Sequence, residues 1–274
     1  MKVKNFIVAI IMNFILIIFT NLLGNSICFF YPKISQFAID ECIVYTIRII
    51  IIVSIIFMLK YKLVLYNCEK FFEGILYSLP LILFYLFFCG QAINWIFIKH
   101  FCLYMPKIKT VFGINFISCL LVGIAEELTY RGLIINYLLE KLEKSKKNYI
   151  YAGIASSCIF SIGHFGIFFM DEADIIMMIM TFVITFMIGF YFAVIYLKTN
   201  NLLFISILHW GWNFTSFCNW QMAKNRYRYT GEIKFYLYQF IVALIMGGIS
   251  ILILYKNPAE QFLKSCKSLA VLHR

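Results

Sequence analysis

The sequence predicts an all-α, polytopic membrane protein built as a bundle of about eight transmembrane helices. Of its 274 residues, 63% are hydrophobic and only 14% are charged, whereas a soluble domain usually carries about 25% charged residues. Folded in water, the chain would expose large apolar patches. The expected surrounding medium is therefore the lipid bilayer.

Eight apolar runs are each long enough to cross a bilayer, which takes about 20 residues of α-helix. In the third run, Pro80 and Gly90 predict a kink or a break. The first run is too long for a signal peptide, so we expect a retained helix. The segments between the runs are too short to fold alone, which predicts a single membrane domain over 1–274. The predicted helices are 6–30, 42–59, 73–98, 111–139, 149–170, 175–197, 201–221 and 236–255.

The net charge of +11 follows the membrane topology and does not indicate a nucleic-acid partner. Lys and Arg lie mostly in the short segments between runs, and no basic cluster is interleaved with aromatic residues as nucleic-acid binding requires. With both termini inside, the inner segments hold more Lys and Arg than the outer ones, although the outer segment 224–234 is also basic. The positive-inside rule therefore predicts a multi-pass protein of the cell membrane with both termini cytoplasmic. The nine cysteines are spread singly, which argues against a disulfide scaffold or a zinc ribbon.

Three of the apolar runs contain strongly polar side chains. A charged side chain near the bilayer centre costs roughly 2.5–3.5 kcal/mol, so such residues usually face a protein interior and mark a functional site. We expect the three runs to meet at one internal polar site. The six residues are Glu126, Glu127 and Arg131 in one run, His164 in the next, and His209 with Asn213 in a third.

Helical spacing predicts how these residues face one another. Glu127 and Arg131 are four apart and share a helix face, so they can form an ion pair. Glu126 is rotated by about 100° from Glu127, and we expect it to face the interior. Asn213 lies one turn beyond His209 on the same face. A purely structural interpretation remains open, because an ion pair or a buried histidine can also serve packing alone.

A carboxylate and two imidazoles at one site are suited to activating water. Glu126 would act as general base, with His164 holding or polarising the water, while His209 and Asn213 would stabilise a developing oxyanion. Glu126, His164 and His209 are equally the ligand types of a catalytic zinc site. We favour the metal-free route, because an amide beside His209 suits an oxyanion site better than a ligand set.

The three motifs together resemble one protein family. Glu-Glu-x-x-x-Arg, Phe-x-x-x-His beginning at Phe160, and His-x-x-x-Asn occur in this order in separate apolar runs. This arrangement is similar to the CAAX-protease and bacteriocin-processing enzyme family, the ABI or CPBP intramembrane proteases, which are related to the Ras-converting CAAX endopeptidases. The resemblance covers about 111–221, the expected protease core.

The resemblance implies a hydrolase that cleaves a peptide bond in a membrane-associated or lipid-anchored peptide or protein. It further implies a role in bacteriocin processing or immunity, and it leaves open whether the enzyme is a metalloprotease. By matching positions, it implies a water-activating pair, an oxyanion-stabilising pair and a supporting pair. These are, in that order, Glu126 with His164, His209 with Asn213, and Glu127 with Arg131.

Two other functions fit some of the same observations. A transporter or proton relay also places carboxylates and histidines within the membrane, but it predicts inverted repeats and interrupted helices that the sequence does not display. A non-catalytic membrane regulator need not retain all four candidate catalytic groups, and this chain has all four.

Overall fold

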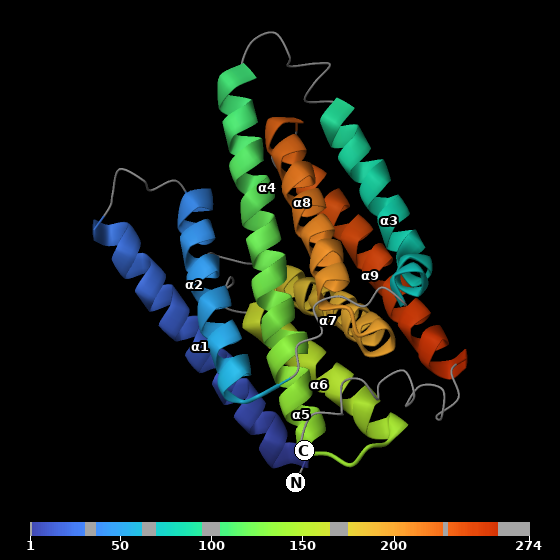
Figure 1. The fold of residues 1–274 in the computed structure, drawn as a ribbon. Coiled ribbons are helices and arrows are strands. Elements are labelled where there is room, and N and C mark those ends of the chain that lie inside the picture. Colours follow the sequence, from blue (N-terminus) through green and yellow to red (C-terminus); the bar gives the residue numbers. More distant parts are fainter. Residues whose placement is uncertain are drawn as a thin grey trace.

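The computed structural model describes residues 2–30, 37–61, 70–94, 105–164, 175–226 and 230–256, and the regular structure in them is helical. Met105–Glu127 (α4), Leu128–Ile135 (the π-helix η4) and Asn136–Glu140 (α5) follow one another without interruption, so these residues form eight helical spans (Figure 1). The predicted all-α polytopic membrane fold is confirmed. The other spans are α1 (Lys2–Phe30), α2 (Phe37–Met58), α3 (Phe71–Asn94), α6 (Lys146–Gly163), α7 (Ile175–Thr199), α8 (Leu202–Arg226) and α9 (Thr230–Lys256).

Five spans among the described residues are long and apolar enough to cross a membrane, and they come from α2, α3, the continuous α4–η4–α5 helix, α7 and α9. In α1 the corresponding apolar stretch is shorter, Lys4–Thr20. The spans α6 and α8 are not in this group, and both carry many polar side chains. A helix whose polar groups are buried against other helices does not need to be apolar all round, which fits the burial of Ser156, Ser157 and His209.

The helix α3 continues as an α-helix through Pro80 and Gly90 to Asn94, so this span is not broken, and the alternative of a kink stays a prediction. Proline removes one backbone hydrogen bond and crowds the preceding turn, but neighbouring packing compensates for such defects in membrane helices. The ends of two predicted spans, 95–98 and 165–170, lie outside the described residues.

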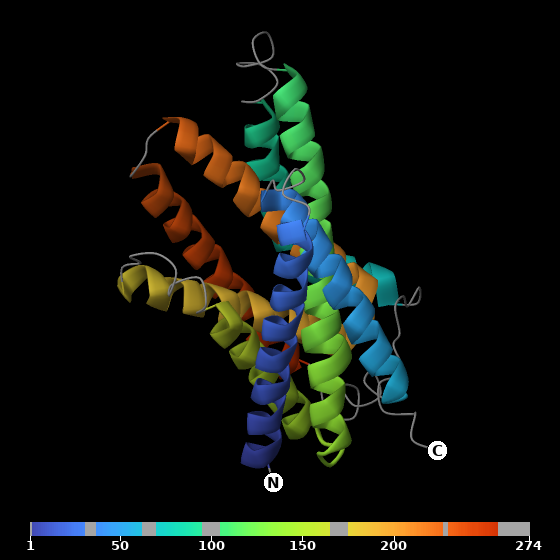
Figure 2. The same cartoon turned by 90° about the vertical axis from the view of Figure 1, so that its left-hand side faces the viewer.

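The helix α7 forms the interior of the bundle. Its second half, from Ile188 to Thr199, is buried at every position, and α7 packs against α3, α6, α8 and α9. Figure 2 shows α7 strongly inclined to the more upright α1, α2 and α4. A helix that is apolar all round belongs inside a protein or in lipid, and here the protein supplies much of that environment.

Two glycines set how closely the helices approach around the site. A Cβ atom on Gly123 of α4 would lie 3.0 Å from both the carbonyl oxygen of Ser206 and the amide nitrogen of Trp210 in α8. A Cβ atom on Gly189 of α7 would lie 2.9 Å from the ring of Phe160 in α6. Small residues let membrane helices pack with their backbones close together. These two contacts bring α4, α6, α7 and α8 around one point (Figure 1).

Candidate active site

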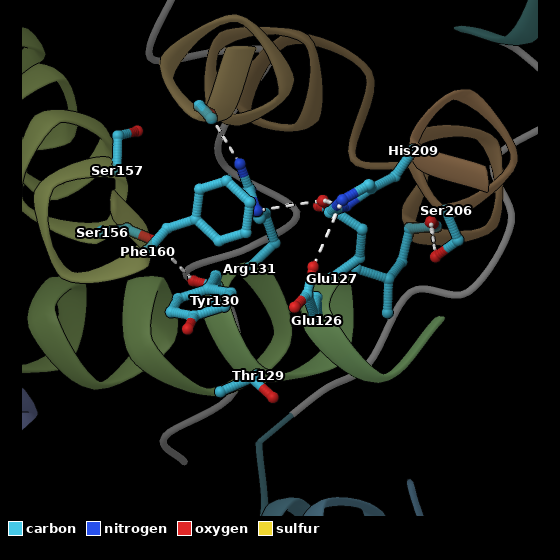
Figure 3. A network of polar contacts seen from close by, with 12 residues as sticks. Glu126, Glu127, Thr129, Tyr130, Arg131, Ser156, Ser157, Phe160, Ser206 and His209 are labelled. Atoms are coloured by element: carbon cyan, nitrogen blue, oxygen red, sulfur yellow. Dashed lines mark hydrogen bonds and ion pairs between the residues drawn. The ribbon is translucent and has the colours of Figure 1, made fainter. Parts of the chain in front are cut away.

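The carboxylate of Glu127 joins three helices at the centre of the bundle. Its Oε1 atom accepts hydrogen bonds from Arg131 Nη1 at 3.0 Å and from His209 Nδ1 at 2.7 Å (Figure 3). The side chains of Glu127 and Arg131 are both fully buried. The ion pair predicted from their spacing is therefore present, and it has an imidazole as an additional partner.

The contact with Glu127 defines the orientation of His209. Because the Glu127 oxygen also accepts a proton from Arg131, we infer that it acts as an acceptor toward His209 and that the imidazole carries a proton on Nδ1. The other ring nitrogen, Nε2, lies 3.3 Å from Oε2 of Glu126. A carboxylate that fixes one nitrogen of a histidine leaves the second nitrogen in a defined position for chemistry.

Two of the three nitrogens of the Arg131 guanidinium have hydrogen-bond partners, and two aromatic rings lie close to it. Besides its bond to Glu127, its Nη2 donates to the carbonyl oxygen of Gly189 at 2.5 Å. The guanidinium carbon lies 5.6 Å from the centre of the Phe160 ring and 5.9 Å from that of Phe192, within the range of cation–π attraction. An arginine removed from water and lipid needs such partners, because an unpaired buried charge is strongly destabilising.

A π-helical segment, η4, begins directly after the two glutamates. All eight of its residues are buried, and Ser156 of α6 donates a hydrogen bond to the carbonyl oxygen of Tyr130 within it at 2.9 Å. Short π-helical segments are rare and occur frequently at functional sites. Nothing in the motif spacing predicts η4. The backbone hydrogen bonds of a π-helix span five residues and those of an α-helix span four, and a buried segment of either kind has the same apolar composition.

His164 and Asn213 lie beside this network and take no part in the hydrogen bonds that join Glu127, Arg131 and His209. The Nδ1 atom of His164 lies 2.9 Å from the carbonyl oxygen of Phe160, to which it donates. The ring of Phe160 lies between the two imidazoles, with its centre 4.5 Å from that of His164 and 5.7 Å from that of His209. Asn213 is half-buried on α8, one turn beyond His209. The structure thus gathers Glu126, Glu127, Arg131 and His209 tightly, and it leaves His164 and Asn213 at the edge.

Among the residues that the structure describes, no group of three or more His, Cys, Asp or Glu side chains is arranged to hold a metal ion. Glu126 and His209 are in contact, but His164 does not complete a three-ligand set with them. A catalytic zinc ion takes three protein ligands and one open position. The side chains of Glu126, His164 and His209 therefore do not fit such a zinc site.

Comparison with known proteins agrees with the motifs. Residues 109–215 match the family model described as type II CAAX prenyl endopeptidase, Rce1-like. This segment is similar to the Rce1-like family, and the match covers less than half of the chain. The Rce1-like segment runs from α4 into α8 and contains all six site residues predicted from the sequence. No curated protein and no solved structure matches the chain.

Two further buried polar residues lie outside the Rce1-like segment and escape the motif comparison. Arg48 on α2 and Asn13 on α1 are 6% and 1% exposed. The signal that identifies Arg48 is present in the sequence, because it is a lone arginine inside an apolar run, and such residues are functional candidates. Asn13 carries a weaker signal, since an uncharged amide is tolerated more readily in a membrane helix.

Proposed function

We propose that the protein is a membrane-embedded endopeptidase that hydrolyses a peptide bond in a membrane-associated or lipid-anchored peptide or protein. The observation that carries the proposal is the imidazole of His209, hydrogen-bonded by Glu127 on one side and facing Glu126 on the other. The match of 109–215 to a family of endopeptidases supports the same conclusion. A site made only for packing would have no need of a second carboxylate at 3.3 Å from an imidazole that already has a partner.

The geometry supports a division of labour between the two glutamates. Glu126 takes a proton from water, whose oxygen attacks the carbonyl carbon of the scissile bond. His209, oriented by Glu127 through Nδ1, points Nε2 toward the carbonyl oxygen; an imidazolium at this position, with a proton on both nitrogens, would donate from Nε2 as negative charge develops there. Glu126 then passes the proton to the leaving amine, so that the bond breaks and the site returns to its starting state.

His164 and Asn213 complete this scheme as groups that engage when substrate is bound. With Nδ1 of His164 donating to the Phe160 carbonyl, the neutral ring offers Nε2 as an acceptor for the attacking water. The amide of Asn213 would supply a second donor to the oxyanion. Catalytic hydrogen bonds are often incomplete before substrate binds, which accounts for the position of both residues at the edge of the network.

The cellular role follows as a part of the proposal. We place both termini in the cytoplasm on the distribution of Lys and Arg, and we propose a processing or immunity function in which a peptide or a bacteriocin precursor is the substrate. This step rests on family analogy, since one fold serves several substrates.

A membrane proteome comparison tests the activity without knowledge of the substrate. Cells producing the wild-type protein are compared with cells producing Glu126→Gln, which preserves the shape of the side chain and removes the base. New peptide termini in membrane proteins should appear only with the wild type. Glu143→Gln is the matched control, because Glu143 is an exposed carboxylate near the end of the same helical segment. Identical termini in wild-type and Glu126→Gln cells would contradict the proposal.

A further inference from the structure

A second buried polar cluster lies beside the site, formed by Asn13 on α1, Arg48 on α2 and Tyr130 on η4. None of the three side chains is more than 6% exposed. Within the part of the chain that the structure describes, Nε and Nη2 of Arg48 have no hydrogen-bond partner, and neither do Nδ2 and Oδ1 of Asn13. Four unpaired polar atoms on two neighbouring helices are unusual, because native proteins satisfy nearly all buried polar groups. Such atoms are available to bind a polar group that the chain itself does not supply.

This polar cluster adjoins the proposed catalytic residues. Tyr130 follows Glu126 by one helical turn, and its hydroxyl interacts with the side chains of both Asn13 and Arg48. A Cβ atom on Gly163, the neighbour of His164, would lie 3.1 Å from the Tyr130 hydroxyl and 3.6 Å from the Asn13 amide nitrogen. The cluster thus lies next to Gly163, the neighbour of His164, and includes a residue one helical turn from Glu126.

The charge of Arg48 has no close counterpart among the described residues. The two nearby carboxylates are engaged elsewhere, since Glu126 faces His209 at 3.3 Å and Glu41 accepts a hydrogen bond from Ser118 at 2.7 Å. The guanidinium carbon of Arg48 lies 5.9 Å from the centre of the Tyr45 ring, which is a weak attraction compared with an ion pair. A buried arginine without an ion-pair partner is costly and is ready to bind an anion.

We propose that Arg48 and Asn13 form a subsite that binds a carboxylate of the substrate next to the bond that is cleaved. The proposal rests on the endopeptidase function proposed above and deepens it. A guanidinium matches a carboxylate with two parallel hydrogen bonds, and the amide group of Asn13 adds a donor. The carboxylate belongs either to the C-terminus of the substrate or to an acidic side chain. Because Arg48 and Asn13 lie outside the segment 109–215, this specificity comes from the part of the chain that the family match does not cover.

The depth of Arg48 argues against a lipid headgroup as the occupant. Arg48 lies 10 residues from the end of α2 at Met58, or about 15 Å along a helix that rises about 1.5 Å per residue. Its distance from the start of α2 is similar. A lipid phosphate at the membrane surface does not reach this depth, whereas a peptide drawn into the site does.

Binding measurements on full-length protein in detergent test the subsite separately from catalysis. The background variant is Glu126→Gln, so that no cleavage occurs. Three fluorescent apolar tetrapeptides are compared: one with a free C-terminal carboxylate, one with a C-terminal amide, and one with a C-terminal amide and a glutamate as its last residue. Hydrogen bonds between charged groups predict that the free acid binds about 10- to 100-fold more tightly than the plain amide. The glutamate peptide distinguishes a side-chain carboxylate from a terminal one.

Further variants in the same background assign the preference to the cluster. Arg48→Gln should reduce the ratio between acid and amide to about one, and Arg48→Lys should retain part of it. Ser54→Ala, an exposed position on the same helix, is the control and should keep the full ratio. If Arg48→Gln fails to fold, Asn13→Ala should still lower the ratio, because it removes one donor and leaves the charge.

The subsite is overturned if the parent protein binds neither carboxylate-bearing peptide more tightly than the plain amide, or if the preference survives in folded Arg48→Gln. A preference for carboxylate that is lost in Arg48→Gln supports the subsite even if no proteolysis is found in cells. That combination would contradict the proposed function alone.

Discussion

Removing the charge of Glu127 should unfold the protein more easily and abolish its activity at the same time. In Glu127→Gln the side chain keeps its size, but the fully buried Arg131 loses its only ion-pair partner among the described residues. Breaking one partner of a buried ion pair costs about 3–5 kcal/mol. His209 also loses the acceptor that orients it at 2.7 Å. We therefore expect a decrease of about 3–5 kcal/mol in the free energy of unfolding.

A double-mutant cycle distinguishes the ion pair from general packing damage. Arg131→Met removes the charge and retains much of the length, and replacing both members of a buried pair by uncharged groups is often close to neutral. The double variant Glu127→Gln with Arg131→Met should therefore be more stable than Glu127→Gln alone. Equilibrium unfolding of the purified protein in mixed detergent micelles measures each variant. Strict additivity of the two single effects would refute the reasoning, because residues that interact directly do not behave independently.

Three further predictions concern helix approach, the histidines and the metal. Gly123→Ala should lower the free energy of unfolding by about 1–3 kcal/mol, because its Cβ would lie 3.0 Å from the backbone of α8. Gly113→Ala, with nothing within 4 Å of its Cβ, should raise the free energy of unfolding by up to about 1 kcal/mol in the same assay, because alanine favours a helix more than glycine does. His164→Ala and His209→Ala should each reduce peptide cleavage at least 100-fold, about the effect of losing an acid–base group, while His273→Ala should not, and equal tolerance of all three would return both histidines to a packing role. Elemental analysis of active wild-type protein should find well under one equivalent of metal per chain, and a stoichiometric metal that is lost in His164→Ala would reverse our preference for the metal-free route.

Much of the fold follows from the sequence because hydrophobic length identifies five of the spans among the described residues. The i,i+4 pairing of Glu127 with Arg131 was also predictable, since it depends only on local helical geometry. The contacts of His209 were not predictable in the same way. They depend on how closely α4 approaches α8, and that distance is set by Gly123 against the backbone of Ser206 and Trp210. A motif search identifies the residues of a site, whereas their distances come from packing between helices.

The helix is not broken at Pro80, and Arg48 was not among the residues predicted for the site. These two differences from the sequence analysis have opposite causes. A proline in a soluble helix interior is strongly destabilising, and the expectation of a break gave that local rule too much weight inside a packed membrane helix. Arg48 was visible in the sequence as a single charge in an apolar run. It has no neighbouring motif, however, so its meaning depends on Asn13 and Tyr130, which come from two other helices.

The adjacent glutamates take different roles because consecutive residues on a helix point in directions about 100° apart. Glu127 and Arg131 face α7 and α8, where Gly189 and His209 complete their hydrogen bonds. Glu126 lies instead on the same side as Tyr130, one turn away, and Tyr130 interacts with Asn13 of α1 and Arg48 of α2. One carboxylate therefore holds the helices together through the two hydrogen bonds that its Oε1 atom accepts, and the other touches His209 and lies one turn from Tyr130 of the polar cluster. A hydrolytic site requires this difference between the two glutamates. Glu126 is available as a base for water, and Glu127, which is engaged with Arg131, fixes the orientation of the neighbouring His209.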